Sequence, residues 1–268
     1  MASNTKQLRN RIKSVNSTLH LTKAMGLVAS SKIRKATDAM LKSRSYKEAV
    51  TDVINSVVAS PECRKSVYLK GGEGKKAKII VVAGDRGLAG GYNANIFRLC
   101  KNYEDAEFIS VGKRSCDRFG GDVNYAESFG YEDAIKLSKD LCKDFADGKY
   151  DTLGIISSEY VSILTQEAKY TTILPLTPGN VSDTKAVTVF EPNEMQILET
   201  AIVEYVAGVI VAHIRESFAC EVAARRNAMD SAGKNAQEMI DNLLLEYNRA
   251  RQGAITQELT EIVAGSGI

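Results

Sequence analysis

The chain has 268 residues, and its composition of 44% hydrophobic and 25% charged residues is ordinary for a soluble globular protein. Its net charge of +2 is close to neutral, and no internal repeat or low-complexity tract is present. No apolar run approaches the roughly eighteen residues that a membrane span requires, so we expect no transmembrane segment. The start, M-A-S-N-T-K-Q, lacks an apolar core and predicts no secretory signal.

Residue usage gives little support for metal or disulfide chemistry. The cysteines are scattered without a C-x-x-C pair, and only two histidines are present. This pattern predicts a reduced compartment and unpaired thiols, and we expect neither a metal site nor another cofactor. The residues concerned are Cys63, Cys100, Cys116, Cys142, Cys220, His20 and His213.

The first segment is predicted to be one helix over residues 3–58, because proline is absent before Pro61 and apolar or small residues recur at alternating steps of four and three. The average step of about 3.5 is the coiled-coil period. The residues in the middle of this seam, Thr22, Gly26 and Ala29, have small side chains, so a partner helix could approach closely there. The seam comprises Leu8, Ile12, Val15, Leu19, Thr22, Gly26, Ala29, Ile33, Ala36, Met40, Ser43, Lys47, Val50, Ile54 and Val57.

The same segment is strongly basic. Residues 1–50 hold eleven Lys and Arg against Asp38 and Glu48, which gives 11 − 2 = +9, so the other residues carry 2 − 9 = −7. Such a helix suggests nucleic acid, a membrane surface or an acidic protein as partner, or else a solvated face without one. Aromatic side chains that could stack on bases are missing before Tyr46, so we favour an acidic protein over nucleic acid.

The middle of the chain alternates predicted strands with predicted helices. Three continuous apolar runs are typical of buried parallel strands, and a fourth run is weaker. This alternation predicts an α/β domain with a parallel sheet. The predicted strands cover residues 78–83, 108–111, 153–157 and 170–174, and the predicted helices cover 92–103 and 131–146.

A glycine-rich loop, Gly84–Asn93, follows the first predicted strand. Such a turn before a helix can hold phosphate on its backbone N–H groups. The sequence G-D-R-G-L-A-G-G-Y-N is neither a P-loop nor a clean G-x-G-x-x-G motif, and no Lys-Ser or Lys-Thr pair follows it. We interpret it as a tight turn that needs glycine dihedrals, with nucleotide binding as the less favoured alternative.

The sequence contains no recognisable set of catalytic residues. His20 and His213 each stand alone on a predicted helix, which is more typical of a structural residue. Ser157-Ser158-Glu159 ends a predicted strand with no histidine in view. No G-x-S-x-G or H-E-x-x-H motif occurs, so we expect that the chain is not an autonomous enzyme.

The last segment is predicted to be helical from about Asn193 and to pair antiparallel with the first helix. Helices of 55 and 70 residues would span about 80 and 105 Å, against about 50 Å for a compact protein of this size, so we expect a protruding rod. The seam of mainly apolar and small residues on this last helix begins with Met195, Leu198, Ile202, Tyr205 and Val209. It continues with Met229, Gly233, Ala236, Ile240, Leu243, Tyr247, Ala250, Ala254 and Gln257.

The end of this segment mixes polar and apolar groups on a slim helix. A frayed, solvated tail would leave Ile255, Leu259 and Ile262 wet, so we expect this surface to touch something outside the chain. Its polar residues include Arg249, Arg251, Gln252, Thr256, Gln257 and Glu258.

Three stretches resemble the gamma subunit of F-type ATP synthases. Arg11–Ala36 resembles the first helix of that family, Gly84–Asn95 its central loop, and Glu246–Gly265 its carboxyl-terminal signature. They stand in family order at both ends and in the middle, so the resemblance covers the whole chain. It implies a fold of the α/β class: a long antiparallel coiled coil of the N- and C-terminal helices plus a central Rossmann-like domain. The implied domains are 1–60, 75–190 and 193–268.

The resemblance also implies a function and partners. The chain would be a non-catalytic rotor shaft inside a ring of alpha and beta subunits, with its body near the epsilon subunit and the membrane ring of c subunits. Lys23 and Met25 would face an acidic loop of the catalytic subunits, and Arg251, Gln252 and Thr256 would lie at the upper contact with the ring. Neither nucleic acid nor a direct membrane span is implied.

We therefore expect a central shaft that couples ion flow to ATP synthesis or hydrolysis, peripheral to the cytoplasmic face of a bacterial plasma membrane. The mitochondrial inner membrane, matrix side, is the alternative location. The rival function is a nucleotide-binding α/β protein with a coiled-coil dimerisation arm. The rival predicts nucleotide binding by the isolated chain, whereas the shaft does not.

Overall fold

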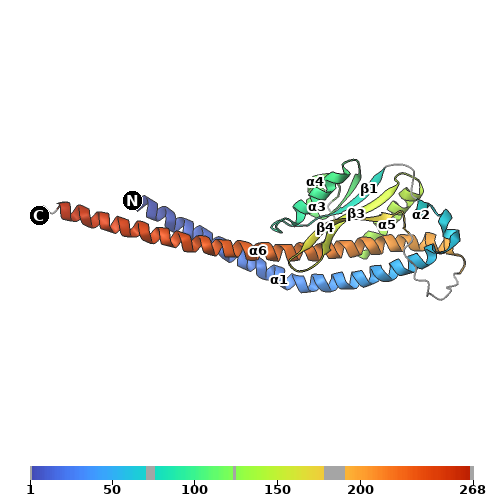
Figure 1. Ribbon diagram of the computed structural model, residues 1–268, viewed down its shortest axis with the longest axis horizontal. Helices are drawn as coiled ribbons and strands as arrows, with labels where there is room; N and C mark the ends of the chain where they lie inside the picture. Colours follow the sequence, from blue (N-terminus) through green and yellow to red (C-terminus); the bar gives the residue numbers. More distant parts are fainter. Residues whose placement is uncertain (1, 71–75, 123–124, 178–190, 266–268) are drawn as a thin grey trace. The chain divides into compact units, whose positions relative to one another are not determined.

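A computed structural model describes residues 2–70, 76–122, 125–177 and 191–265 (Figure 1). Its contacts divide the chain into two compact units. We call Met1–Ser30 with Arg225–Ile268 the coiled-coil unit, and Ser31–Ala224 the body unit. The division 1–60, 75–190 and 193–268 follows element type rather than contacts, and it stays a prediction.

Two long helices form the ends of the chain. Helix α1 covers Ala2–Val58, with 57 residues, and helix α6 covers Glu194–Gly265, with 72 residues. Helix α1 ends shortly before Pro61, where a missing backbone N–H would break it. Helix α6 begins after Asn193, whose side-chain oxygen accepts the N–H of Gln196 at 2.9 Å and so satisfies a free donor of the first turn. The predicted long terminal helices are confirmed.

In the coiled-coil unit the two helices run antiparallel. A Cβ atom on Gly26 would lie 3.7 Å from the Met229 Cβ, and one on Gly233 would lie 3.6 Å from the Thr22 hydroxyl. The residue numbers of the two pairs have the same sum, 26 + 229 = 22 + 233 = 255. Higher residue numbers on α1 therefore lie beside lower residue numbers on α6, which is the antiparallel arrangement. Leu19, Ala236 and Ile240 form a buried apolar cluster at the same register. The small seam residues therefore allow the close approach that the sequence predicted.

The body unit contains one sheet of four strands in the order β2-β1-β3-β4. Strand β1 pairs parallel with β2 and with β3, as predicted. Strand β4 pairs antiparallel with β3, so the expectation of a purely parallel sheet is wrong for this edge. The connection of five residues, 161–165, is far too short for a parallel crossover and can only make a hairpin. The strands are β1 Ala77–Val82, β2 Glu107–Val111, β3 Thr152–Tyr160 and β4 Gln166–Leu174.

Short helices complete the body unit. The predicted helices at 92–103 and 131–146 are present, the first as an α-helix that ends in a 3-10 turn. Helix α4 was not predicted, because its seven residues, K-R-S-C-D-R-F, are too few to show a helical period. These elements are η1 Pro61–Lys65, α2 Val67–Lys70, α3 Tyr92–Cys100, η2 Lys101–Tyr103, α4 Lys113–Phe119 and α5 Tyr131–Ala146.

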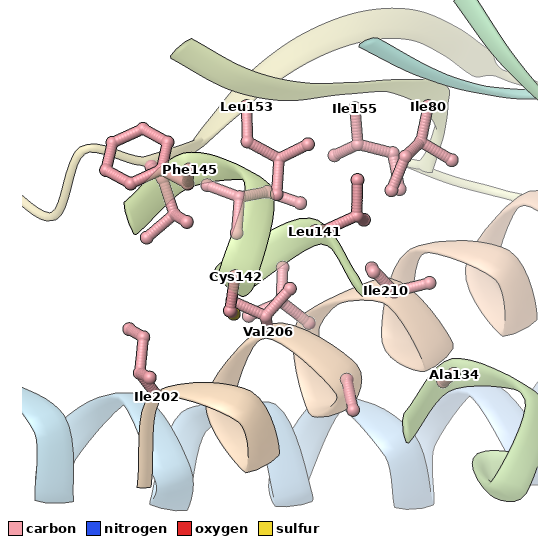
Figure 2. Packing of buried hydrophobic residues seen from close by; sticks show 14 of the residues in the cluster. Ile80, Ala134, Leu141, Cys142, Phe145, Leu153, Ile155, Ile202, Val206 and Ile210 are labelled. Carbon is pink, nitrogen blue, oxygen red and sulfur yellow. The ribbon is translucent and has the colours of Figure 1, made fainter. Parts of the chain in front are cut away.

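Alternate residues of β1 face opposite layers. Ile79 and Val81 pack with helix α3, whereas Ile80 and Val82 belong to the cluster that includes α5 and α6. Figure 2 shows Ile80 and Ile155 pointing from the strands toward Ile210 of α6. Within the body unit, α6 lies between the sheet and α1 (Figures 1 and 2). Helix α6 thus contributes to the core of the body unit.

Helix α6 meets the length and composition of a membrane span, with a window of mean hydropathy 1.7 in the described part of the chain. Half of that window is buried within the protein. Ile202, Ile210 and Ile214 of α6 belong to the core cluster of the body, which accounts for the apolar character of this stretch. A single helix of this kind is weak support for a membrane span, because core helices share the same composition.

Candidate functional site

The glycine-rich loop that follows β1 is fastened to α6 by a buried carboxylate. Glu221 of α6 is only 2% exposed, and its carboxylate oxygens accept the backbone N–H groups of Asp85 at 3.3 Å and Arg86 at 3.4 Å. The preceding N–H, that of Gly84, donates to the side-chain oxygen of Asn93 at 2.9 Å. These donors are the groups that would hold a phosphate in a nucleotide-binding turn. Here the protein's own side chains occupy them, which supports the interpretation of the loop as a structural turn.

Glycine leaves room for the Glu221 carboxylate where the loop approaches α6. A Cβ atom on Gly84 would lie 2.9 Å from the carboxyl carbon of Glu221, closer than real Cβ contacts permit. The outer part of the loop is exposed: Leu88 has 60% of its surface exposed and adopts a φ of 62°, and Gly90 adopts a φ of 56°. Leu88 is thus an exposed apolar residue in a backbone conformation that costs free energy for a non-glycine residue.

The side chain of Asp85 extends the same network away from α6. Its carboxylate accepts the N–H groups of Lys113 at 3.2 Å and of Ala126 and Glu127, both at 2.9 Å. A carboxylate that accepts several backbone N–H groups forms charge-assisted bonds stronger than neutral ones. The loop is therefore tied both to α6 and to the segment before α5.

A second polar contact joins β3 to α6. The Ser157 hydroxyl lies 2.9 Å from Nδ1 of His213, so the expectation that Ser157 has no histidine near it is wrong. The two residues are 56 positions apart, and only the packing of β3 on α6 brings them together. A serine–histidine pair of this kind has to be tested as a nucleophile and its base.

The chemistry of this pair does not suit nucleophilic catalysis. Burial lowers the pKa of His213 to about 3, and the charges of Lys47 and Lys169 add to that effect. A general base works best with a pKa near the working pH, so this imidazole is a poor proton acceptor. Ser157 is also only 3% exposed and offers no open face to a substrate. We therefore assign the pair a structural role, as predicted for His213.

The next residues of α6 also make hydrogen bonds and an ion pair with residues of the sheet, α3 and α1. Glu216 accepts the N–H of Tyr160 at 3.1 Å and pairs with the Arg44 guanidinium at 2.6 Å. The Ser217 hydroxyl accepts the N–H of Ser158 at 3.2 Å and lies 2.7 Å from the Tyr92 hydroxyl. Burial and the nearby Glu221 charge raise the pKa of Tyr92, so it stays a neutral phenol. His213, Glu216, Ser217 and Glu221 thus form a polar strip on one face of an otherwise largely apolar stretch of α6.

A groove lies between α1 and α6 at the end of the body unit where α6 begins. Its volume is about 830 Å³, and its lining is mainly apolar. Val50, Val53 and Ile54 contribute from α1, and Ile197 and Glu204 contribute from α6. In the described part of the chain, no cluster of three or more His, Cys, Asp or Glu side chains could hold a metal ion.

The five residues named from the family resemblance fall in two separate places. Lys23 is exposed and Met25 is half-buried on α1, while Arg251, Gln252 and Thr256 are exposed on α6. Gly233 lies opposite Thr22, so Arg251 is 251 − 233 = 18 residues further along α6, or about 27 Å at the helical rise. The structure therefore does not bring the two groups together, and their role as contacts stays a prediction.

The register of the coiled-coil unit explains why apolar residues at the end of α6 are exposed to solvent. With positions that add to 255, residue 254 of α6 lies level with the start of α1. Residues 255–265 consequently extend past the end of their partner helix. The apolar residues there lie at helical spacing on one face, with Ile255 46%, Leu259 58%, Ile262 66% and Val263 65% exposed.

Glu221 and Asp85 were not recognised from the sequence. A signal for Glu221 was present: it is the one acidic residue in the run F-A-C-E-V-A-A at positions 218–224. A charge within such an apolar run is buried only when hydrogen bonds compensate for its lost solvation. No comparable signal marks Asp85, because its partners are backbone groups from distant segments.

Comparison with known proteins identifies relatives along the full length of the chain. The family model for ATP synthase matches residues 4–267. The sodium-ion-specific ATP synthase gamma chain of Acetobacterium woodii is 36% identical over 99% of this chain and 99% of its own length. The ATP synthase gamma chain of Ruminococcus albus is 38% identical over 98% of both chains.

Solved structures show the same fold at lower sequence identity. The rotor of the Euglena gracilis mitochondrial ATP synthase aligns with a TM-score of 0.68 and 14% identity, covering 95% of this chain and all of that one. The central stalk of the Tetrahymena thermophila mitochondrial enzyme aligns with a TM-score of 0.59 and 21% identity, over 79% of this chain. The full-length match at more than a third identity is decisive: the chain belongs to the family of ATP synthase gamma chains.

Proposed function

We propose that this chain is the central rotor shaft of an F-type ATP synthase, which couples ion flow through the membrane sector to ATP synthesis or hydrolysis. The observation that carries the proposal is the pair of antiparallel terminal helices, in which α6 extends past the start of α1. An overhanging single helix with exposed apolar residues is suited to a close-fitting sleeve formed by other subunits. Full-length similarity to ATP synthase gamma chains supports the same role.

The shaft itself is non-catalytic in this proposal. The N–H groups of Asp85 and Arg86 that could hold a phosphate are taken by Glu221, and the Ser157–His213 pair is a poor nucleophile and base. Nucleotide chemistry then belongs to the partner subunits. The rival function, a nucleotide-binding protein with a dimerisation arm, has less support, because the N–H groups at the start of this loop, from Gly84 to Arg86, are bonded within the chain.

The proposed partners are the alpha and beta subunits around the coiled-coil unit, and the epsilon subunit and the c-subunit ring near the body unit. Lys23 and Met25 would contact an acidic loop of the catalytic subunits, which suits the +9 charge of residues 1–50. Arg251, Gln252 and Thr256 are exposed and would contact the ring of catalytic subunits. The assembled shaft would be peripheral to the cytoplasmic face of a bacterial plasma membrane, and the proposed partners include no nucleic acid.

Co-expression with the alpha and beta subunits of a relative tests the proposal against its rival. We expect a tagged chain to co-purify with both subunits as an active ATPase, and we expect the isolated chain to bind no ATP by calorimetry. A chain that binds ATP alone, dimerises and recovers neither subunit would contradict the shaft and favour the rival.

A further inference from the structure

We propose that Glu221 is a positioning residue that fixes the glycine-rich loop to α6, so that the loop and the body follow the shaft when it turns. Helix α6 is shared between the core of the body and the coiled coil, and Glu221 lies near the end of its body portion. The part of this proposal that concerns coupling rests on the rotor function proposed above. The positioning of the loop does not, because it follows from contacts within this chain.

The contact between Glu221 and the loop is directional. Apolar packing between α6 and the sheet has no preferred bond direction, whereas the Glu221 carboxylate accepts two consecutive N–H groups, from Asp85 and Arg86. The carboxylate is 2% exposed, so the free energy of its burial depends on these and its other polar contacts. A displacement of the loop along α6 would break bonds that water cannot readily replace.

The start of the loop fits closely around this carboxylate. A Cβ at Gly84 would lie 2.9 Å from the carboxyl carbon of Glu221, so a side chain there would displace the carboxylate from its present position. The exposed outer part of the loop contains Leu88 in a left-handed conformation. A strained residue of this kind persists only where its surroundings hold it in place. Glu221 fixes the residues two and three positions before Leu88, Arg86 and Asp85, through their backbone N–H groups.

The polar contacts of the loop continue through the body unit. Asp85 accepts the N–H of Glu127, and the Glu127 carboxylate pairs with Lys32 of α1 at 2.6 Å. The backbone oxygen of Glu127 also accepts Arg215 of α6 at 3.2 Å. The loop, α1 and two points on α6 are thus joined by one set of polar contacts, all within the body unit.

A spin label on the loop tests the positioning role in the isolated full-length chain. All five native cysteines are buried, so a nitroxide would attach selectively to a Leu88→Cys variant. We expect a restrained spectrum in this background, a mobile spectrum after Glu221→Ala, and partial recovery when formate or acetate is added to fill the vacated carboxylate position. Circular dichroism would confirm the fold of each variant. Glu238→Ala, which removes an exposed glutamate of α6, is the control and should leave the spectrum restrained.

A second variant covers the case in which Glu221→Ala does not fold. Gly84→Ala leaves Glu221 intact but forces its carboxylate away from the loop, so it should mobilise the same label, and added formate should not restore it. An unchanged spectrum in a folded Glu221→Ala chain, or in a folded Gly84→Ala chain, would overturn the proposal.

The coupling role is measured in the assembled complex reconstituted into vesicles. We expect Glu221→Ala to keep ATP hydrolysis but to lower the ions transported per ATP several-fold, with partial recovery in formate. A mobile label with unchanged transport per ATP would overturn the coupling role. Failure of the wild-type chain to assemble with its partner subunits would instead contradict the rotor function, and the spin-label result would still decide whether Glu221 positions the loop.

Discussion

The carboxylate of Glu216 on α6 lies 2.6 Å from the guanidinium of Arg44 on α1, and it also accepts the N–H of Tyr160 on β3. One largely buried side chain therefore joins both long helices to the sheet. Its side chain is 9% exposed, whereas that of Arg44 is 38% exposed. The burial of the Arg44–Glu216 pair is intermediate. An exposed ion pair contributes little to stability, whereas disruption of a fully buried one leaves an uncompensated charge.

Removal of Arg44 should therefore destabilise the body unit measurably. We expect Arg44→Ala to lower the free energy of unfolding by about 1–3 kcal/mol, because Glu216 would lose a charge-assisted partner while still buried. Urea unfolding followed by circular dichroism measures this change. Lys42→Ala, an exposed cation on the same helix, is the control and should change stability by less than about 0.5 kcal/mol. Equal effects of the two substitutions would show that the Arg44–Glu216 pair contributes nothing.

Gly26 should tolerate a methyl group but not a larger side chain. A Cβ at this position would make an ordinary contact, 3.7 Å from the Met229 Cβ. We expect Gly26→Ala to stabilise the coiled-coil unit by about 0.5–1 kcal/mol through helix propensity, and Gly26→Leu to destabilise it by overpacking. Hydrogen exchange of the amides around Leu19 and Ile240 would detect both changes. Destabilisation by alanine as well would mean that the helices approach more closely than 3.7 Å implies.

The chain should lose stability in mild acid because of His213. Burial and two nearby lysines lower its folded-state pKa to about 3, whereas an unfolded histidine titrates near pH 6.5. The unfolded chain therefore binds the proton first, and stability that is present above about pH 6.5 is lost as the pH falls toward 3. We expect a loss of about 1–2 kcal/mol between pH 7 and pH 5 from this residue.

Urea unfolding of His213→Gln at the two pH values checks this pH dependence. The variant should show a smaller drop than the wild-type chain, even where its stability at pH 7 is lower. His20→Gln, which leaves His213 in place, should keep the wild-type drop. If His213→Gln and wild type lose the same stability between pH 7 and pH 5, the imidazole takes up its proton equally well in the folded chain.

A positive charge at Met25 should disturb coupling. Met25 is half-buried on α1, and Lys23 lies two positions away on a different face of the helix, so Met25→Lys adds a cation to a face that carries none at this position. At the proposed contact with an acidic loop, the extra cation would strengthen the electrostatic attraction to that loop. This attraction would stabilise one rotational position of the shaft relative to the others. We expect a lower ratio of ATP-driven ion transport to ATP hydrolysis in reconstituted vesicles. An uncharged Met25→Leu variant should keep the wild-type ratio, and an unchanged ratio in Met25→Lys would argue against the contact.

The apolar face beyond the end of α1 should matter for the assembly but not for the isolated chain. Leu259 is 58% exposed and lies in the part of α6 that has no α1 residue beside it. We expect Leu259→Gln to leave thermal unfolding of the isolated chain unchanged and to lower ATP synthesis by the complex. Glu261→Gln, on the opposite face of the same helix, should affect neither measurement. Wild-type synthesis by Leu259→Gln would leave this face without a role.

Much of the fold followed from periodicity. The alternating four- and three-residue steps predicted α1 and α6, because both helices bury a narrow seam along most of their length. The apolar runs at 78–83 and 153–157 predicted β1 and β3, since a strand covered on both faces is apolar throughout. The direction of β4 was missed, because strand composition does not encode it; the shortness of the connection at 161–165 does.

The polar contacts of α6 could not have been predicted in the same way. Glu221 binds backbone N–H groups 135 and 136 positions away, and backbone groups carry no residue-specific signal. His213 was recognised as structural, but its partner Ser157 was not, because the pairing depends on how β3 packs across α6. Register between distant elements is decided by the whole core rather than by either segment.

Rotation of this chain inside the ring of alpha and beta subunits can be observed in a single-molecule assay. The chain would be assembled with alpha and beta subunits fixed to a surface, and a bead would be attached through a Lys139→Cys substitution on the exposed face of α5. We predict that ATP drives unidirectional rotation of the bead, which stops when ATP is withdrawn. Sustained ATP hydrolysis by the same complexes with a stationary bead would contradict the account.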